Sequence, residues 1–481
     1  MVSTSIAAIV PILCVTAAGI AAMLAEAFRE PHERMPISGL GLVGLVGAGI
    51  SCVLLWGRNA TSFGVVSADN FGLFISLVLV LIGVVTMLLA PQLVERDELP
   101  GGEFYALSLF ALAGMMLMAM ATDLLVIFLA LEVLSLAVYV LTAIRREAAA
   151  SVEGAFKYFI LGGFSSAFFL YGLAFVYGVT GSTRLDKVGS AIASNAGSHP
   201  ELVLVALGFL IVGFGFKVSA VPFHMWTPDA YEGAPAIVTG FMSTGVKAAA
   251  FAAFVRVFVT AFQPVQATWT PILWAVASVT MILGTVVGVA QVNLKRMLAY
   301  SSIAHAGYIL VGLVSGNDVG KSAILFYLLA YGITNLGAFG VIALLGTRDR
   351  ANDDLDSVTG LSDRHPALAA VLAVLLLSLG GIPPTAGFVG KWYIFSAAVR
   401  AGDYGLAIIG VVTSVVSIFF YLRVIVMMYM AEPAEMHGGP ATAPSRAAVF
   451  ALAATIAATF YLGVLPTQVI DLAARSIGSL R

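Results

Sequence analysis

Charged residues are scarce in this sequence. Asp, Glu, Lys and Arg together make up only 10% of the 481 residues, whereas hydrophobic residues make up 60%, and the mean hydropathy is +1.00. A soluble domain needs a polar shell, so this composition excludes one. The net charge of −2 offers no basic surface, which excludes a nucleic-acid partner. Membrane lipid must be the solvent for most of the chain.

Cysteine and histidine are rare as well. The two cysteines, Cys14 and Cys52, lie in apolar runs, so neither a disulfide framework nor a cysteine-based metal site can be built from them. Of the six histidines only His305 falls at predicted membrane depth, whereas a membrane di-haem cytochrome needs paired histidines there. Patterns typical of a catalytic triad, a phosphate loop or a metal cluster are also missing. The sequence therefore predicts no metal and no cofactor bound by this chain.

A basic N-terminal region is missing too, because no Lys or Arg precedes Arg29. A cleaved signal peptide begins with such a region. We therefore expect the first apolar run to be a helix of the mature protein.

What the sequence has in abundance is long apolar runs. A helix needs roughly 20 apolar residues to cross the hydrocarbon core of a bilayer. We predict an all-α polytopic membrane protein of about fourteen transmembrane helices, with no connection long enough for a soluble domain. The predicted crossings are 4–24, 37–56, 71–91, 104–121, 123–143, 156–180, 203–222, 236–258, 270–291, 298–316, 322–346, 366–398, 404–430 and 447–470.

The distribution of basic residues predicts an orientation. If the N-terminus is periplasmic, the cytoplasmic connections carry more Lys and Arg than the opposite ones. The positive-inside rule favours that arrangement.

Two of the predicted helices contain disruptive prolines. Pro222 lies near the end of the seventh run, and Pro383 and Pro384 lie in the middle of the twelfth. Each proline removes a backbone donor and clashes with the carbonyl four residues earlier, so both helices should be broken. The carbonyls that lose their donors in this way are those of Val218, Leu379 and Gly380.

The two breaks are five crossings apart, which indicates a five-helix unit used twice. Transporters built from inverted repeats carry broken helices in matching places. We predict two inverted repeats, helices 4–8 over residues 104–258 and helices 9–13 over 270–430. An N-terminal three-helix segment, 1–103, precedes them, and a C-terminal helix and tail, 447–481, follow.

Four ionisable residues lie at predicted membrane depth: Glu132, Lys217, Lys247 and Lys391. A charge at a helix centre costs roughly 2.5–3.5 kcal/mol on insertion scales, so each of the four needs a reason to persist. One explanation without a function is that the lysine side chain snorkels, which means that it extends to the membrane interface. The functional explanation is proton transfer, because burial lowers the proton affinity of a lysine and a nearby carboxylate raises it again. Glu132 is the only carboxylate at this depth, so we expect it to pair with Lys217.

Three further residues are possible proton relays. His305 could bridge a water chain or hold a hydrogen bond in the core. Lys157 opens the sixth helix, where snorkelling and proton transfer remain open alternatives. His224 lies at the mouth of the first broken helix.

Several of these residues lie in segments that resemble a known family. GFGFKVSAVPFHMWTPDAYEGAPAIVTGFMSTGVKAAAFAAFVRVF at 213–258 resembles the signature of the N subunit of respiratory complex I, and the Tyr-Glu-Gly shortly after Asp229 favours that subunit. LEVLSLAVYVL around Glu132, NLKRMLAYSSIAHAGYIL at 293–310 and GIPPTAGFVGKWYIF at 381–395 are similar to the same family. The resemblance runs from about the fourth helix to the thirteenth.

The resemblance implies a fourteen-helix subunit in the membrane arm of a bacterial NADH:quinone oxidoreductase, in the cell membrane. Partner subunits would hold FMN, the iron–sulfur clusters and the quinone. In that family the Glu132–Lys217 pair, Lys247 and Lys391 form a charged chain along the membrane midplane. The related M subunit has glutamate at the position of Lys391 and the L subunit continues into a long lateral helix, so both fit worse.

Two rival functions remain open. A free-standing cation/proton antiporter, or a subunit of one, shares the fold and the buried lysines, but would exchange cations without an electron donor. A non-pumping structural subunit would use the charges only to fix helix packing.

Overall fold

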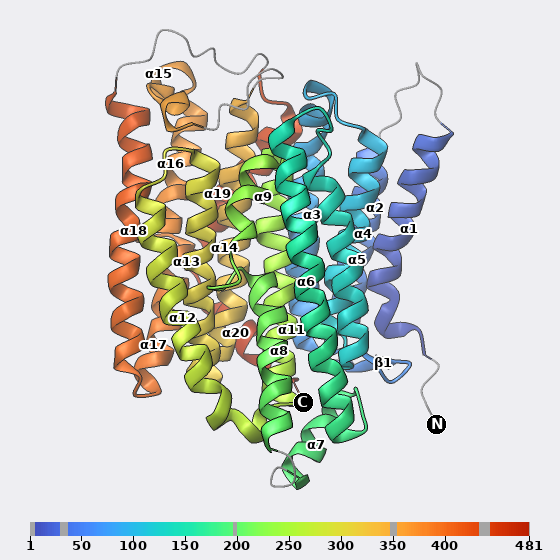
Figure 1. The fold of residues 1–481 in the computed structure, drawn as a ribbon. Helices are drawn as coiled ribbons and strands as arrows, with labels where there is room; N and C mark the ends of the chain where they lie inside the picture. Colours follow the sequence, from blue (N-terminus) through green and yellow to red (C-terminus); the bar gives the residue numbers. More distant parts are fainter. Residues whose placement is uncertain (1–4, 29–36, 196–199, 347–353, 432–442, 481) are drawn as a thin grey trace.

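The computed structural model describes residues 5–28, 37–195, 200–346, 354–431 and 443–480. The chain runs up and down in one helical bundle, and both ends of the chain are at the lower end in Figure 1. Thirteen helices of the described residues are long and apolar enough to cross a membrane. The broken pair α16 and α17 supplies one more, so the prediction of about fourteen crossings in an all-α protein is confirmed.

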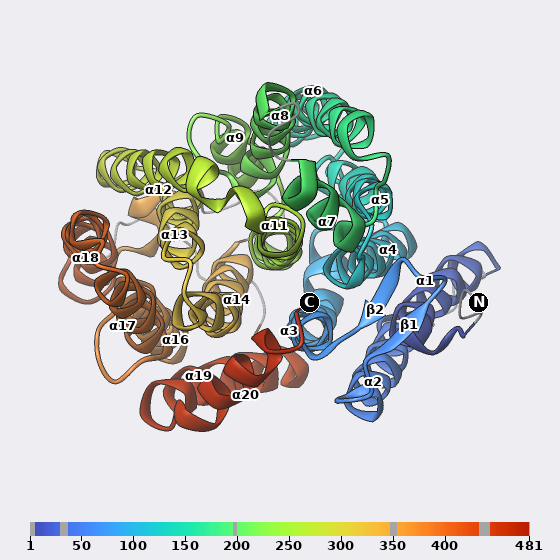
Figure 2. The same cartoon turned by 90° about the horizontal axis from the view of Figure 1, so that it is seen from below.

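The N-terminal segment consists of three crossings and a small hairpin. The hairpin strands pair antiparallel, with Thr61 opposite Ser67, and lie at the lower end beside the first two helices (Figure 2). The elements are η1 (Ala7–Ile9), α1 (Val10–Ala27), α2 (Ile37–Leu55), β1 (Ala60–Ser62), β2 (Val66–Ala68) and α3 (Asn70–Arg96).

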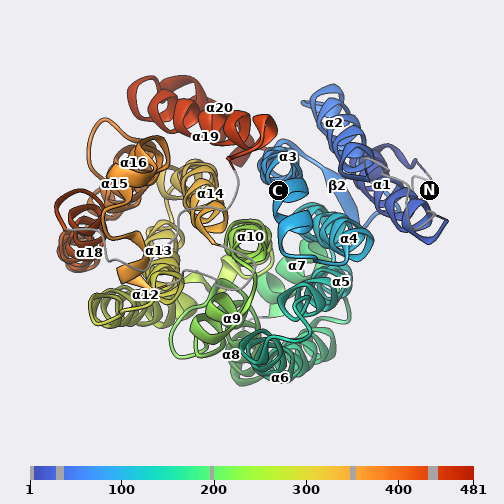
Figure 3. The ribbon, with the colours of Figure 1, turned by 90° about the horizontal axis from the view of Figure 1, so that it is seen from above.

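Two larger groups of helices follow, and they lie side by side when the bundle is viewed along its length (Figure 3). The first group is α4 (Gly101–Met120), α5 (Leu124–Thr142), α6 (Ala149–Thr180), α7 (Leu185–Asn195), α8 (Pro200–Val218), α9 (Trp226–Gly233), α10 (Ala236–Phe241), the π-helical turn η2 (Met242–Val246) and α11 (Lys247–Thr260). The second is η3 (Gln263–Val265), α12 (Gln266–Val289), α13 (Leu294–Val314), α14 (Asp318–Leu345), η4 (Leu355–Val358), α15 (Leu361–Arg364), α16 (Pro366–Gly380), α17 (Ala386–Arg400) and α18 (Tyr404–Met430). The chain ends with α19 (Arg446–Val464) and α20 (Thr467–Ile477).

The direction of the helices suits an inverted repeat. Five is an odd number of crossings, so a second five-helix unit must begin at the opposite end of the bundle from the first. In Figure 1 α4 runs downward and α12 runs upward. The division at 1–103, 104–258, 270–430 and 447–481 stays a prediction.

Short polar side chains begin many of the helices. An N-cap residue satisfies backbone N–H groups that have no partner within the helix. Asp123, for example, accepts from the backbone of Leu125 at 2.9 Å before α5. The N-caps of this kind are Asp69, Asp123, Asn293, Asn317, Asp403 and Ser445.

Both predicted broken helices are present. The seventh crossing is interrupted at 219–225, between α8 and α9, and the twelfth at 381–385, between α16 and α17. The peptide bonds Val221–Pro222 and Pro383–Pro384 are cis.

Three features were missed by the sequence analysis. The predicted helix over 236–258 contains the π turn η2, which no local sequence signal announces. The other two are the short helices α7 and α20, which lie at the lower end of the bundle (Figure 1). Each is 11 residues long, which is too short to cross a membrane.

Three crossings form the core of the bundle. They are the one made of α10, η2 and α11, the helix α13 and the helix α14. These are enclosed along almost their whole length, whereas the outer helices α1, α2, α6 and α19 are mostly exposed. Many exposed side chains on the outer helices are apolar, for example Val43, Phe164 and Phe450, as expected of a surface that faces lipid. Polar groups on the central helices are therefore shielded from lipid.

Candidate functional site

Lys217 lies next to the end of α8, where the helix is broken. Ser219, two residues later, has a φ of 64° and turns the chain out of the helix. Trp226, the first residue of α9, donates from its indole nitrogen to the carbonyl of Phe216 at 3.0 Å. The break thus turns the chain while keeping Lys217 inside the bundle.

Aromatic rings surround the amine of Lys217. The distances from Nζ to the ring centroids are 5.2 Å for Tyr139, 5.3 Å for Tyr158 and 5.7 Å for Phe216. These are cation–π distances. Among the described residues the amine has no hydrogen-bond partner. Lys217 is therefore a buried amine held by rings rather than by oxygen atoms.

Glu132 lies near Lys217 without forming a direct ion pair. One carboxylate oxygen of Glu132 is buried and has no hydrogen-bond partner in the part of the chain that the structure describes. The carboxylate is close enough to interact electrostatically with Lys217. Tyr139 is seven residues after Glu132 on the same face of α5, and its hydroxyl is likewise buried and unpartnered among the described residues. The role of Glu132 as the partner that tunes Lys217 stays a prediction. The sequence analysis missed Tyr139, for which the seven-residue spacing was the available signal.

Lys247 follows directly after the π turn η2. Its amine donates to the backbone carbonyl of Ser302 at 2.5 Å and to the hydroxyl of Ser302 at 2.6 Å. It also lies 5.6 Å from the ring centroid of Tyr331. A π turn inserts one residue into a helix and re-aims the side chains that follow. Here the residue that follows is Lys247, which points to α13.

A chain of polar groups continues from Lys247. Tyr331 donates to the hydroxyl of Ser302 at 2.8 Å. Asn335, one turn further along α14, donates to the hydroxyls of Tyr331 at 3.1 Å and Ser243 at 2.8 Å. Ser243 itself belongs to the π turn. The sequence analysis named none of these partners, since hydroxyl and amide groups within helices carry no distinctive pattern.

His305 lies on α13, one turn after Ser302. Its Nδ1 is 2.7 Å from the Tyr327 hydroxyl, and its Nε2 is 3.2 Å from the Tyr421 hydroxyl. Tyr421 is in turn hydrogen-bonded to Ser301. Both ring nitrogens thus take part in a buried hydrogen-bond network. This geometry is compatible with either alternative for His305, a bridge in a water chain or a hydrogen bond in the core.

Lys391 lies on α17, just after the second break. Its amine donates to the carbonyl of Gly380 at 2.9 Å and to the hydroxyl of Ser414 at 2.8 Å. The Gly380 carbonyl is one of those that the prolines were expected to leave without a helical donor. The amine also lies 5.2 Å from the ring centroid of Tyr308.

Three residues of α13 lie between Lys247 and Lys391. Ser302 binds the first amine and Tyr308 faces the second. The ring of His305 contacts the ring of Tyr308 and that of Tyr331, whose hydroxyl donates to Ser302. The three lysines are only 3%, 2% and 4% exposed for Lys217, Lys247 and Lys391. Snorkelling to an interface is therefore wrong for all three.

Lys157 lies in a different environment. It is 43% exposed and forms ion pairs with Asp229 at 2.8 Å and Glu153 at 2.7 Å. Arg296 pairs with Asp229 and with Glu232, each at 2.7 Å. These five residues form a cluster above the first break, which we call the acidic cluster because it has three carboxylates and two cations.

His224 lies within the first break, as expected. Its side chain is half-buried, and Nδ1 has no hydrogen-bond partner among the described residues. Its backbone carbonyl accepts from Thr227 at 2.9 Å. No hydrogen bond or ion pair among the described residues joins it to Lys217.

Comparisons with known proteins agree over nearly the whole chain. Residues 121–417 match the family described as NADH:quinone oxidoreductase/Mrp antiporter, TM. The chain is 44% identical over 472 residues to NADH-quinone oxidoreductase subunit N of Trichlorobacter lovleyi, covering 98% of this chain and 96% of that protein.

Two solved structures have the same fold. A chain of respiratory complex I from Thermus thermophilus with bound Aureothin matches with a TM-score of 0.83 and 37% identity, covering 96% of this chain and 99% of that chain. A chain of the Mrp complex from Dietzia sp. DQ12-45-1b matches with a TM-score of 0.82 at 22% identity, covering 100% of this chain and 98% of that chain. The second likeness concerns the fold alone.

Proposed function

Since this chain belongs to the NADH:quinone oxidoreductase/Mrp antiporter transmembrane family, we propose a route by which its buried lysines carry protons. The chain is a proton-translocating membrane-arm subunit of a bacterial NADH:quinone oxidoreductase, a multi-pass protein of the cell membrane that assembles with other subunits of complex I. The rival function of an antiporter without redox partners is not favoured, because the near-full-length relatives are named subunit N.

The redox chemistry belongs to partner subunits in this proposal. NADH oxidation, quinone reduction, FMN and the iron–sulfur clusters lie outside this chain, which binds no cofactor. The buried polar groups described above support the proposal, because they are amines, hydroxyls and an imidazole, which exchange protons rather than electrons.

The proton-carrying residues in the proposed route are Lys217, Lys247 and Lys391. A neutral amine accepts a proton and releases it when its surroundings change. Glu132 attracts the charged form of Lys217, and weakening of that attraction lets the proton move inward. The observation that carries the proposal is the position of His305. Its ring centroid lies 5.1 Å from that of Tyr331, beside Lys247, and 5.5 Å from that of Tyr308, beside Lys391.

The two breaks and their neighbours supply the polar surroundings of this route. Irregular backbone at membrane depth is tolerated where it lines a cavity or is buried in protein. At the second break the Gly380 carbonyl binds Lys391. Lys157 lies at the upper side of the first break and His224 lies within it, where we propose that they relay protons toward Lys217.

Replacing Lys247 by alanine tests the route. We expect proton pumping per electron to fall in vesicles that carry the assembled complex, by roughly tenfold or more, since a positioned proton-transfer group typically contributes about 10²–10⁴-fold. The measurement is the proton-to-electron ratio during NADH oxidation. Lys187→Ala, which removes an exposed lysine from α7, serves as the matched control. Full pumping in Lys247→Ala would refute the route.

The coupling of Glu132 to Lys217 has a test of its own. Glu132→Gln is expected to lower pumping less than Lys217→Ala does, because the amine remains. If the carboxylate acts through Lys217, the double variant Glu132→Gln/Lys217→Ala should pump no worse than Lys217→Ala alone, as for residues that act as one unit. Additive losses in that double-mutant cycle would show that Glu132 acts independently.

A further inference from the structure

A groove lies between the upper ends of α4, α5 and α6, three helices that are side by side when the bundle is viewed from above (Figure 3). Its volume is about 420 Å³. Along α6 the lining extends from Val152 to Phe159, a distance of roughly 10 Å along the helix axis. We call this feature the α4–α6 groove.

The deeper part of the α4–α6 groove is apolar. Leu107 of α4, Val140 of α5 and the rings of Phe156 and Phe159 of α6 line it. The last three side chains are 53%, 63% and 49% exposed, so the chain itself leaves them uncovered. In a membrane protein such a surface is covered either by hydrocarbon or by another protein.

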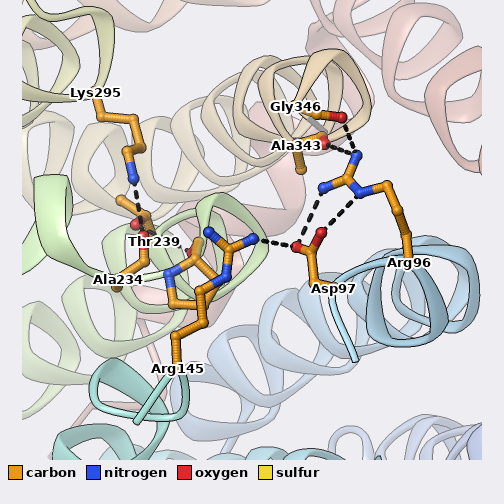
Figure 4. Close-up of polar contacts among 9 residues, drawn as sticks. Arg96, Asp97, Arg145, Ala234, Thr239, Lys295, Ala343 and Gly346 are labelled. Atoms are coloured by element: carbon orange, nitrogen blue, oxygen red, sulfur yellow. Dashed lines mark hydrogen bonds and ion pairs between the residues drawn. The ribbon is translucent and has the colours of Figure 1, made fainter. Parts of the chain in front are cut away.

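Two charges of opposite sign lie at the rim of the groove. Glu103 is in the first turn of α4, and Arg146 follows the end of α5. Both residues are exposed, and neither forms a hydrogen bond or an ion pair with another residue that the structure describes. Basic side chains nearby are already paired, since Arg145 donates to Asp97 (Figure 4) and Lys157 belongs to the acidic cluster. The two rim charges are therefore available to a ligand.

The depth of the groove favours a lipid over a helix of a partner subunit. A partner's transmembrane helix would need a seam along the whole hydrocarbon core, roughly 30 Å. The α4–α6 groove starts at the polar ends of the helices and extends over only about a third of that depth. A phospholipid of the upper leaflet occupies this part of the membrane, with its charged head group at the interface and its acyl chains below.

The rim charges indicate which head group fits. An arginine guanidinium binds a phosphate through paired hydrogen bonds, and basic side chains near the interface recognise lipid head groups in this way. A carboxylate such as that of Glu103 accepts hydrogen bonds from a primary ammonium, but it repels a head group whose only charge is the phosphate. A quaternary ammonium has no hydrogen to donate. The rim therefore fits an ethanolamine phospholipid better than a glycerol or a choline phospholipid.

We propose that the α4–α6 groove is a binding site for phosphatidylethanolamine. The phosphate accepts hydrogen bonds from Arg146, and the ammonium donates to Glu103. One acyl chain lies against Phe156 and Phe159. The site is independent of the proton route, because no rim residue belongs to that route.

The bound lipid covers the outer side of the rings around Lys217. Tyr139 is part of the lining of the groove, and its ring centroid is 5.2 Å from Nζ of Lys217. The ring of Phe159 packs against that of Tyr139, with 5.8 Å between the centroids. An acyl chain on Phe159 therefore keeps water from the lipid-facing side of this aromatic group.

The test uses the assembled complex in phosphatidylcholine liposomes that contain a small fraction of phosphatidylethanolamine with a photoactivatable diazirine in one acyl chain. After illumination, adducts on this subunit are mapped by mass spectrometry. We expect them to concentrate on the groove side of α5 and α6, at Val140, Phe156 and Phe159. Phosphatidylcholine and phosphatidylglycerol with the same diazirine should label these positions less, by roughly threefold, which is within the range of one exposed charge pair.

Two variants test the head group. Arg146→Gln should lower labelling by phosphatidylethanolamine about threefold, again as for one exposed charge pair. Glu103→Gln should abolish the preference for phosphatidylethanolamine over phosphatidylglycerol, because the repulsion of the second lipid is then gone. Glu147→Gln and Arg446→Gln are the matched controls. They change an exposed carboxylate and an exposed arginine that do not line the groove, so labelling should stay at the wild-type level.

A third variant fills the groove without changing a charge. Val140→Trp places a large ring where the acyl chain lies, and it should assemble because this side chain is at the surface. We expect labelling to fall by roughly tenfold or more, since losing the burial of only two or three methylene groups has that effect. Val133→Trp is the control, because Val133 is seven residues earlier on the same face of α5, is 46% exposed and lies outside the groove.

Three results overturn the proposal. Adducts spread evenly over the outer helices, or equal labelling by the three lipids, would show only the lipid that surrounds any membrane protein. Absence of adducts at the groove would mean that a partner subunit covers it. Unchanged labelling in Arg146→Gln or in Val140→Trp would remove the head group or the acyl chain from the site. The assay needs no electron transfer, so its result does not depend on whether Lys247→Ala still pumps.

Discussion

Replacing Lys217 by alanine is expected to lower both NADH-driven proton pumping and electron transfer by roughly tenfold or more. This is a conservative figure, because a positioned proton-transfer group typically contributes about 10²–10⁴-fold to a rate. The reason is its place at the first break, where its amine is buried among three rings beside Glu132. Electron transfer should fall as well, because the two processes are coupled. The measurement is pumping and NADH oxidation side by side in membrane vesicles.

Lys217→Arg separates proton transfer from packing in this experiment. An arginine keeps the positive charge among the rings but cannot release a proton at any working pH. We expect the arginine variant to assemble and to pump as poorly as the alanine variant. Normal pumping in either variant would make Lys217 a packing residue and would require a different proton route, although the family would stand.

Replacing Arg256 by leucine is expected to destabilise the subunit more than any of the lysine substitutions does. Arg256 forms two hydrogen bonds to Asp69, at 2.6 and 2.8 Å, and two to the carbonyl of Ala119. The side chains of Arg256 and Asp69 are 1% and 7% exposed. Removing one partner of a buried ion pair leaves the other charge uncompensated, which costs about 3–5 kcal/mol. Little subunit should then be found in the assembled complex.

An exposed ion pair provides the matched control for Arg256→Leu. Arg184 pairs with Asp186 at 2.8 Å, and both side chains are about half exposed. Surface pairs of this kind contribute about 0–1 kcal/mol, so Arg184→Leu should assemble normally. The measurement is the amount of subunit in the complex on native gels, together with the thermal unfolding temperature. Equal assembly of the two variants would contradict the structural role of Arg256.

Asp69 shows why such a contact escapes sequence analysis. It precedes the third crossing in the place of an ordinary helix cap, which it also is, since it accepts from the backbone of Gly72 at 2.7 Å. Its partner Arg256 is 187 residues away. Nothing local links a cap in one helix to an arginine near the end of another.

The lysine sites divide in a similar way between sequence and structure. Sequence alone placed Lys217, Lys247 and Lys391 at membrane depth, because hydropathy is a local property and a charge within an apolar run is conspicuous. It did not give Ser302 as the partner of Lys247, which depends on a π turn and on the packing of α11 against α13.

The sequence by itself determined the class, the number of crossings, the two breaks and the positions of three lysines within apolar runs. Each of these follows from chemistry within a single helix: apolar length, a missing backbone donor at proline, or the cost of burying a charge. Only the tertiary structure decided which groups those charges meet. Ser302, Gly380 and the rings around Lys217 become neighbours of the lysines through packing between helices. Arg96, at the end of α3, binds a carbonyl near the end of α14, and Arg145, from the α5–α6 connection, binds the same Asp97 carboxylate as Arg96 does (Figure 4). Such contacts join residues that are far apart in the sequence, so they cannot be predicted from any single stretch of it.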